Sequence, residues 1–172
     1  MTTQIKSSPA TDWEDRLADL LPLFGHRNWI VVADSAYPAQ SRPGIETIVS
    51  GADQIEVLRE VLAAISASKH IDANIYLDSE LKFVAEQDAR GVASYREQVE
   101  ALFAASSLSR LPHEQIITRL DQSAQIFRFL IIKTGMTIPY TSVFFELDCG
   151  YWNAAAEQRL RKAILEAEGK QS

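Results

Sequence analysis

The feature that most constrains the fold is an uninterrupted apolar run, Trp29-Ile30-Val31-Val32-Ala33, which ends at Asp34. A strand with one face in water alternates apolar and polar side chains, whereas a strand covered on both faces is apolar throughout. The run therefore predicts a strand in a parallel sheet that helices cover on both sides. Ligand crevices in such sheets lie beyond the carboxyl ends of the strands, which is where Asp34 stands.

Helical and strand-like segments alternate along the rest of the chain. Apolar side chains recur at helical spacing in residues 11–24, 52–67, 113–126 and about 152–167. Strand-like runs follow at 74–77, 107–111, 127–132 and 141–147. This alternation predicts an α/β fold, a three-layer α/β/α sandwich. Only eight residues join the last two strands, too few for a helical crossover, so we expect them to run antiparallel in a mixed, mostly parallel sheet.

The length and composition fit one domain. At 172 residues, with 47% hydrophobic and 23% charged side chains, the chain is long enough to bury a core without disulfides. Residues 1–10 are polar, and we expect them to form a flexible tail. Residues 11–172 then form a single domain with an added C-terminal helix. The single cysteine, Cys149, is expected to pack as a small core hydrophobe.

Several function classes are disfavoured by what the sequence lacks. A net charge of −6 with scattered basic residues does not favour nucleic acid, because affinity for phosphates requires clustered Lys and Arg. No apolar run approaches the ~20 residues of a membrane helix. The glycines form no phosphate-binding motif, and the three histidines and one cysteine have no zinc spacing. We expect a cytoplasmic protein without a bound metal.

The segment 25–38 is the most informative for function. It places His26 just before the buried strand and Asp34 just after it. Imidazole titrates near neutrality and can act as an acid or a base, and a carboxylate accepts hydrogen bonds from hydroxyl groups. The simpler alternative is that His26 helps to end a helix and Asp34 caps a loop.

Three segments in order carry a resemblance to a known family. Residues 25–38, a Gly-His pair, an apolar strand and Ala-Asp-x-x-x-Pro, resemble the opening motif of the ribose pyranase and fucose mutarotase (RbsD/FucU) family. Residues 129–135 and 139–143 resemble its closing segment, where a strand ends in glycine before a tyrosine-x-asparagine motif. Residues 111–115 resemble a histidine-bearing turn of the pyranase branch. The resemblance covers roughly residues 14–148.

The resemblance implies an isomerase that interconverts anomers or ring forms of a monosaccharide such as ribose or fucose, without a metal or organic cofactor. It also implies ring-shaped homo-oligomers. By motif position, His26 matches the general acid and Asp34 a sugar-binding carboxylate. Tyr140 and Thr141 match the first two positions of the sugar-contacting strand. Ser142 stands where the family has asparagine.

His113 matches a further sugar contact, with Arg119 as the alternative because about five extra residues follow His113. A simpler interpretation makes His113 a surface residue at a helix N-terminus and Tyr140 an edge-strand aromatic. Two other functions stay open: a non-catalytic monosaccharide-binding or transport-accessory protein, and a scaffold whose C-terminal helix contacts partners.

The spacing of His26 and Asp34 has a geometric consequence. Eight residues across an extended strand separate them, which at ~3.3 Å per residue places them about 17–25 Å apart. One monosaccharide cannot touch both. If both act, we expect the pocket to be shared between neighbouring subunits.

Overall fold

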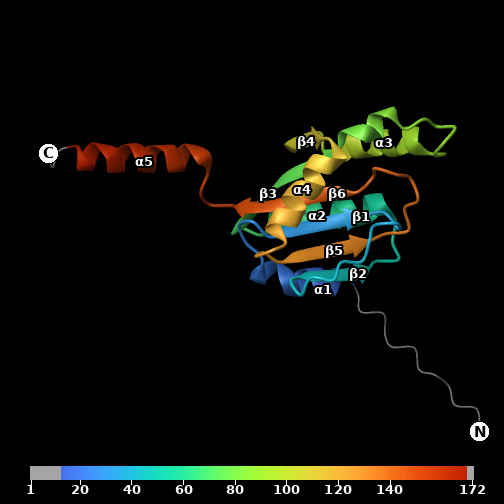
Figure 1. Cartoon of the computed structure of the whole chain (residues 1–172), viewed down its shortest axis with the longest axis horizontal. Coiled ribbons are helices and arrows are strands. Elements are labelled where there is room, and N and C mark those ends of the chain that lie inside the picture. The colour runs from blue at the N-terminus through green and yellow to red at the C-terminus, as the bar shows by residue number, and fades with distance from the viewer. Residues whose placement is uncertain (1–12, 170–172) are drawn as a thin grey trace, which may run out of the picture.

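The apolar run forms β1 (Trp29–Ala33), whose five side chains are all buried inside a six-stranded sheet. The computed structural model describes residues 13–169. The other strands are β2 (Ile45–Val49), β3 (Ile71–Asp78), β4 (Leu108–Leu111), β5 (Phe129–Lys133) and β6 (Val143–Cys149). Their order across the sheet is β2-β5-β1-β6-β3-β4 (Figure 1).

Helices cover both faces of this sheet, which confirms the α/β sandwich (Figure 1). Alternate side chains of β1 explain the layers, because successive residues of a strand point to opposite faces. Ile30 and Val32 pack with α1 (Trp13–Leu20), α2 (Gln54–Ala67) and α3 (Val92–Leu102). Trp29, Val31 and Ala33 pack with α4 (His113–Ser123) on the other face. Short 3₁₀ helices follow α1 (Leu21–Leu23) and β3 (Ser79–Phe83).

The sheet is mixed and mostly parallel, as the sequence predicts. β6 runs antiparallel to both of its neighbours, β1 and β3, whereas the β1–β5, β2–β5 and β3–β4 pairs are parallel. β5 and β6 run in opposite directions, but they are not adjacent because β1 lies between them. The loop at residues 134–142 therefore crosses the carboxyl end of β1 and brings its side chains to Asp34.

The last helix, α5 (Ala154–Glu168), lies apart from the sandwich. It extends away from the sheet in Figure 1, and none of its residues is buried. The tail expected at residues 1–10 lies outside the described residues. Between residues 13 and 169 no helix is long and apolar enough to span a bilayer.

Candidate functional site

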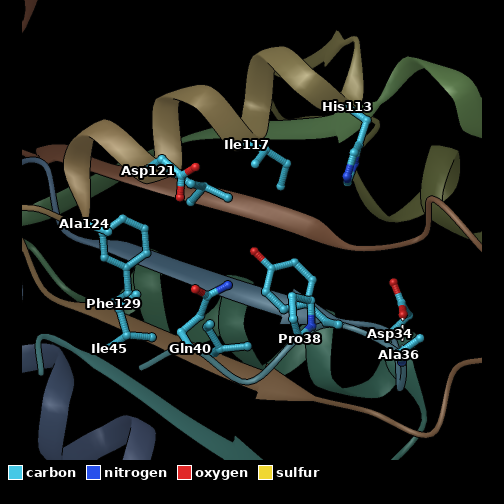
Figure 2. A pocket seen from close by; sticks show the side chains of 13 residues that line it. Asp34, Ala36, Pro38, Gln40, Ile45, His113, Ile117, Asp121, Ala124 and Phe129 are labelled. Carbon is cyan, nitrogen blue, oxygen red and sulfur yellow. Dashed lines mark hydrogen bonds between the residues drawn. The ribbon is translucent and has the colours of Figure 1, made fainter. Parts of the chain in front are cut away.

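A cavity of about 340 Å³ lies between α4 and the sheet, next to the segment that follows β1. Figure 2 shows its two ends. Asp34 and His113 stand at one end, and Ala124 and Phe129 stand at the other. Ligand sites of proteins commonly combine such an apolar wall with a few convergent polar groups. The cavity is therefore the candidate functional site, at the carboxyl end of β1 that the sequence indicates.

Asp34 is held at the cavity by hydrogen bonds to both carboxylate oxygens. The Ser142 hydroxyl donates to Oδ2 over 2.9 Å, and the Ala36 amide donates to Oδ1 over 2.9 Å. The Asp34 amide in turn donates to the Ser142 hydroxyl over 3.2 Å. Each carboxylate oxygen retains a further lone pair that can accept a ligand hydroxyl. Asp34 thus lines the cavity in a fixed orientation.

His113 lines the same end of the cavity and is oriented by a buried carboxylate. Its Nδ1 lies 3.1 Å from Oδ2 of Asp78, a side chain that is almost completely buried. A carboxylate only accepts hydrogen bonds, so Nδ1 carries the proton and Nε2 is the nitrogen left for a ligand. The amide of His113 is also fixed, because it donates to both carboxylate oxygens of Glu80.

Burial raises the pKa of Asp78 to about 6, against an ordinary value of 3.8, and the hydrogen bond from His113 opposes this rise. Its second oxygen, Oδ1, has no hydrogen-bond partner among the described side chains and backbone groups. A half-satisfied buried carboxylate is costly, and strongly shifted carboxyl groups cluster at functional sites. The Asp78–His113 pair therefore has the arrangement of an oriented acid–base group.

Tyr140 lies against the imidazole of His113. The two rings meet edge to face, with centroids 5.7 Å apart and an interplanar angle of 79°. Its backbone has φ 60°, in the left-handed region that side chains other than glycine rarely adopt. Such strain persists where the surrounding structure requires the conformation, and it is common at functional sites. Tyr140 keeps about two-fifths of its surface exposed beside the cavity.

Thr141 and Arg119 lie away from the cavity. Thr141 is fully buried; its hydroxyl donates to the Ile138 carbonyl, and its own carbonyl accepts hydrogen bonds from Gln54 and Tyr95. These contacts fix the loop that carries Tyr140 and Ser142. The guanidinium of Arg119 stacks 5.3 Å from the centroid of the Tyr76 ring. Of the two alternatives weighed from the sequence, His113 and not Arg119 reaches the cavity.

His26 occupies the opposite end of the sheet. Its Nδ1 lies 2.7 Å from Oδ1 of Asp148, near the end of β6, whereas Ser142 and Asp34 meet at the start of β6. Six residues of extended chain separate Asp148 from Ser142, about 20 Å. Both partners of the His26–Asp148 pair are about half exposed. The structure thus brings Asp34, His113, Tyr140 and Ser142 together and leaves His26 apart.

Sequence reasoning missed Asp78, although a signal for it exists. Asp78 ends β3 directly after the buried run Ile75-Tyr76-Leu77, just as Asp34 follows β1. Applying the rule about carboxyl ends of strands to both positions would have identified it. Tyr37 was also missed. It lines the cavity, and burial, followed by the charges of Asp121, Asp78 and Asp34, raises the pKa of its hydroxyl to about 12.

The charged side chains of the described cavity lining are acidic. Among the described residues that line the cavity there are two carboxylates and no lysine or arginine. Between residues 13 and 169 no cluster of three His, Cys, Asp or Glu side chains has the arrangement of a metal site. The polar groups present suit hydrogen bonding to hydroxyl groups and proton transfer.

Comparisons with known proteins find one family model and several solved structures that are similar to this chain. A model of the RbsD / FucU transport protein family matches residues 14–150. The structure of Bacillus subtilis RbsD complexed with D-ribose is 19% identical with a TM-score of 0.53, covering 86% of this chain and 97% of that one. FucU from Bifidobacterium longum is 17% identical with a TM-score of 0.50, covering 78% and 94%. The fucose mutarotase from Streptococcus pneumoniae, solved with L-fucose, is 22% identical with a TM-score of 0.49, covering 82% and 92%. No curated protein matches the chain.

Proposed function

The chain belongs to the RbsD / FucU transport protein family, and from this we propose that it is a sugar mutarotase or pyranase-like isomerase. It would interconvert the anomers or ring forms of a monosaccharide by acid–base opening and closing of the ring. One observation carries the proposal: Asp34 and the Asp78–His113 pair converge at the end of one cavity. D-ribose in the structure of Bacillus subtilis RbsD supports a sugar of that size as the first ligand to test.

The reaction needs two proton transfers, and the site offers groups suited to them. Ring opening removes a proton from the anomeric hydroxyl and delivers one to the ring oxygen, and ring closure reverses both steps. The Nε2 of His113 can accept the first proton because Asp78 holds the proton on Nδ1. Asp34 accepts a hydrogen bond from a sugar hydroxyl and fixes the ring. Tyr140 borders the sugar beside His113.

His26 supplies the second proton in this proposal, from a neighbouring copy of the chain. It cannot do so within its own subunit, because it lies about 20 Å from Asp34 along the sheet. Its exposure leaves Nε2 free to enter the cavity of an adjacent subunit. A homo-oligomer, which the family resemblance implies, is therefore part of the proposal.

A second function, sugar binding without catalysis, is favoured by Ser142. Its hydroxyl donates to the Asp34 carboxylate and accepts from the Asp34 amide. The one hydroxyl proton is therefore already used in a hydrogen bond within the protein. An asparagine side chain would have two N–H donors and a separate acceptor. The site thus has one ligand-directed donor fewer than the family motif provides.

Exchange spectroscopy separates the two functions. The full-length protein is added to D-ribose and, separately, to L-fucose, and saturation transfer between anomer and ring-form signals is measured by NMR. An enzyme accelerates exchange between these signals, whereas a binder broadens them without exchange. No response to these two sugars, or to the other pentoses and hexoses tested in the same way, would contradict both functions and favour a scaffold protein.

A further inference from the structure

The cavity is longer than one sugar ring. Phe129, at its far end, pairs with Trp29 in the sheet register, and Asp34 follows Trp29 by five residues. At about 3.3 Å per residue, the backbone positions at the two ends lie about 16 Å apart. A monosaccharide in contact with Asp34 and His113 cannot also reach Phe129. The volume of the cavity, about 340 Å³, falls in the range of roughly 300–1,000 Å³ that is typical of pockets for drug-sized ligands.

The two ends also differ in chemistry (Figure 2). Asp34 and His113 occupy the first end, whereas the rest of the wall is largely aliphatic and aromatic. These apolar side chains come from β2, α4 and β5, and they are Ile45, Ile117, Leu120, Ala124, Phe129 and Ile131. A sugar hydroxyl placed against such a wall would lose its hydrogen bonds to water. That loss weakens binding roughly tenfold or more for each hydroxyl.

Three further polar side chains line the cavity: Tyr37, Gln40 and Asp121. Asp121 stands beside Ala124 at the second end (Figure 2), but Asp121 and Gln40 are exposed residues and their polar groups can keep hydrogen bonds to water. Tyr37 is partly buried and adds one hydroxyl group to an otherwise apolar wall. Asp121 adds a second negative charge to that of Asp34, and no described lysine or arginine lines the cavity. Two carboxylates repel a phosphate group, so a phosphorylated sugar does not fit.

We infer that the ligand is a neutral reducing sugar that carries an apolar substituent, with the sugar at Asp34 and the substituent along the Phe129 end. The inference rests on the proposed function and specifies its substrate class. Ring opening requires a free anomeric hydroxyl, so the substituent is attached through another carbon. An alkyl ether, an acyl ester or an alkyl-extended sugar has this chemistry.

Matched ligand pairs test the inference. D-ribose, L-fucose and D-galactose are each compared with their mono-O-butyl ethers, prepared at every hydroxyl except the anomeric one. Dissociation constants are measured by calorimetry on the full-length protein, and exchange is followed by NMR in parallel. One buried methylene contributes about fourfold in affinity, and ordering the chain offsets part of this gain. We expect at least one ether to bind about tenfold or more tightly than its parent sugar.

Two variants locate the substituent. Ala124→Leu places extra carbon atoms at the apolar end, and it should remove the gain from the butyl group, measured as the ratio of the dissociation constants of the parent sugar and its ether in the same variant. Gln122→Leu is the matched control, because it adds the same side chain at an exposed position of the same helix. It should preserve the gain.

The outcomes separate this inference from the proposed function. If the protein accelerates exchange of the parent sugars but no ether binds more tightly, the inference is wrong and the function stands. If neither sugars nor ethers bind, both are wrong. If Ala124→Leu changes the sedimentation of the protein, a second copy fills the apolar end and the inference is wrong.

Discussion

The regions beyond the two ends of β1 contain similar residue types in very different surroundings. At the carboxyl end, a histidine pairs with a nearly fully buried aspartate, and a second aspartate and a strained tyrosine lie next to them. At the amino end, His26 also pairs with an aspartate, but both partners are about half exposed. The first arrangement is formed by residues of one subunit. The second can act only on a molecule that approaches from outside, and in the proposed function His26 therefore enters the cavity of a neighbouring subunit.

The largest expected effect comes from removing the exposed histidine. We expect His26→Ala to lower the rate of sugar exchange by about 10²–10⁴-fold, the usual contribution of one acid–base group. The unfolding free energy should change little, because the imidazole is mostly exposed. Exchange NMR and urea unfolding on the same sample check both parts. Unchanged exchange would remove His26 from the mechanism. His70→Ala, at a histidine bonded to backbone carbonyls of Leu21 and Phe24, is the control and should retain exchange.

The next effect concerns the buried end and appears as a pH dependence of stability. Burial raises the pKa of Asp78 to about 6 in the folded protein. Such a group stabilises the fold fully only below its unfolded pKa, near 4, and this contribution is lost as pH rises through 6. Between pH 4 and pH 8 the wild type should therefore lose about 2 kcal/mol relative to Asp78→Asn. Urea unfolding of both proteins at the two pH values measures the difference, and parallel curves would contradict it.

A smaller effect is expected at Tyr140, where one substitution should lower the rate of sugar exchange without lowering the unfolding free energy. Tyr140→Gly relieves the left-handed backbone, so the unfolding free energy should stay equal or rise by up to about 1 kcal/mol. Exchange should nevertheless fall about tenfold, since the ring no longer borders His113, in line with an aromatic contact of about 1 kcal/mol. Tyr140→Phe keeps the ring and isolates the hydroxyl. A glycine variant that is clearly less stable would show that the ring mainly supports the fold.

The smallest effect belongs to the partner of His26. The Cys149 amide and then His26 hold the pKa of Asp148 below its usual range. The pair is half exposed, and exposed pairs contribute less than about 1 kcal/mol. Asp148→Asn should change the unfolding free energy at pH 7 by less than about 0.5 kcal/mol. A larger loss of unfolding free energy would show that the His26–Asp148 pair mainly stabilises the fold.

How much of the structure can be predicted from the sequence depends on how far apart in the chain the interacting residues lie. The β1 strand and the position of Asp34 follow from a local apolar run, and the mixed sheet follows from a short connection. The place of β1 between β5 and β6 does not, since it depends on pairing across more than a hundred residues. The same holds for the Ser142–Asp34 bond and for the cavity, which α4 and β5 create only by packing together. Thr141 shows most clearly what the sequence does not predict. Its neighbours Tyr140 and Ser142 reach the site, whereas the Thr141 side chain is buried in the core.

Complementation between two inactive variants tests the shared site most directly. His26→Ala and Asp34→Asn are co-expressed with different tags, and particles that carry both tags are isolated and assayed for sugar exchange. If one subunit supplies His26 and its neighbour supplies Asp34, random assembly leaves about one quarter of the sites with both residues, and about a quarter of wild-type exchange should return. If doubly tagged particles form but stay inactive, or if a monomeric form is fully active, the two ends of β1 do not meet around one sugar.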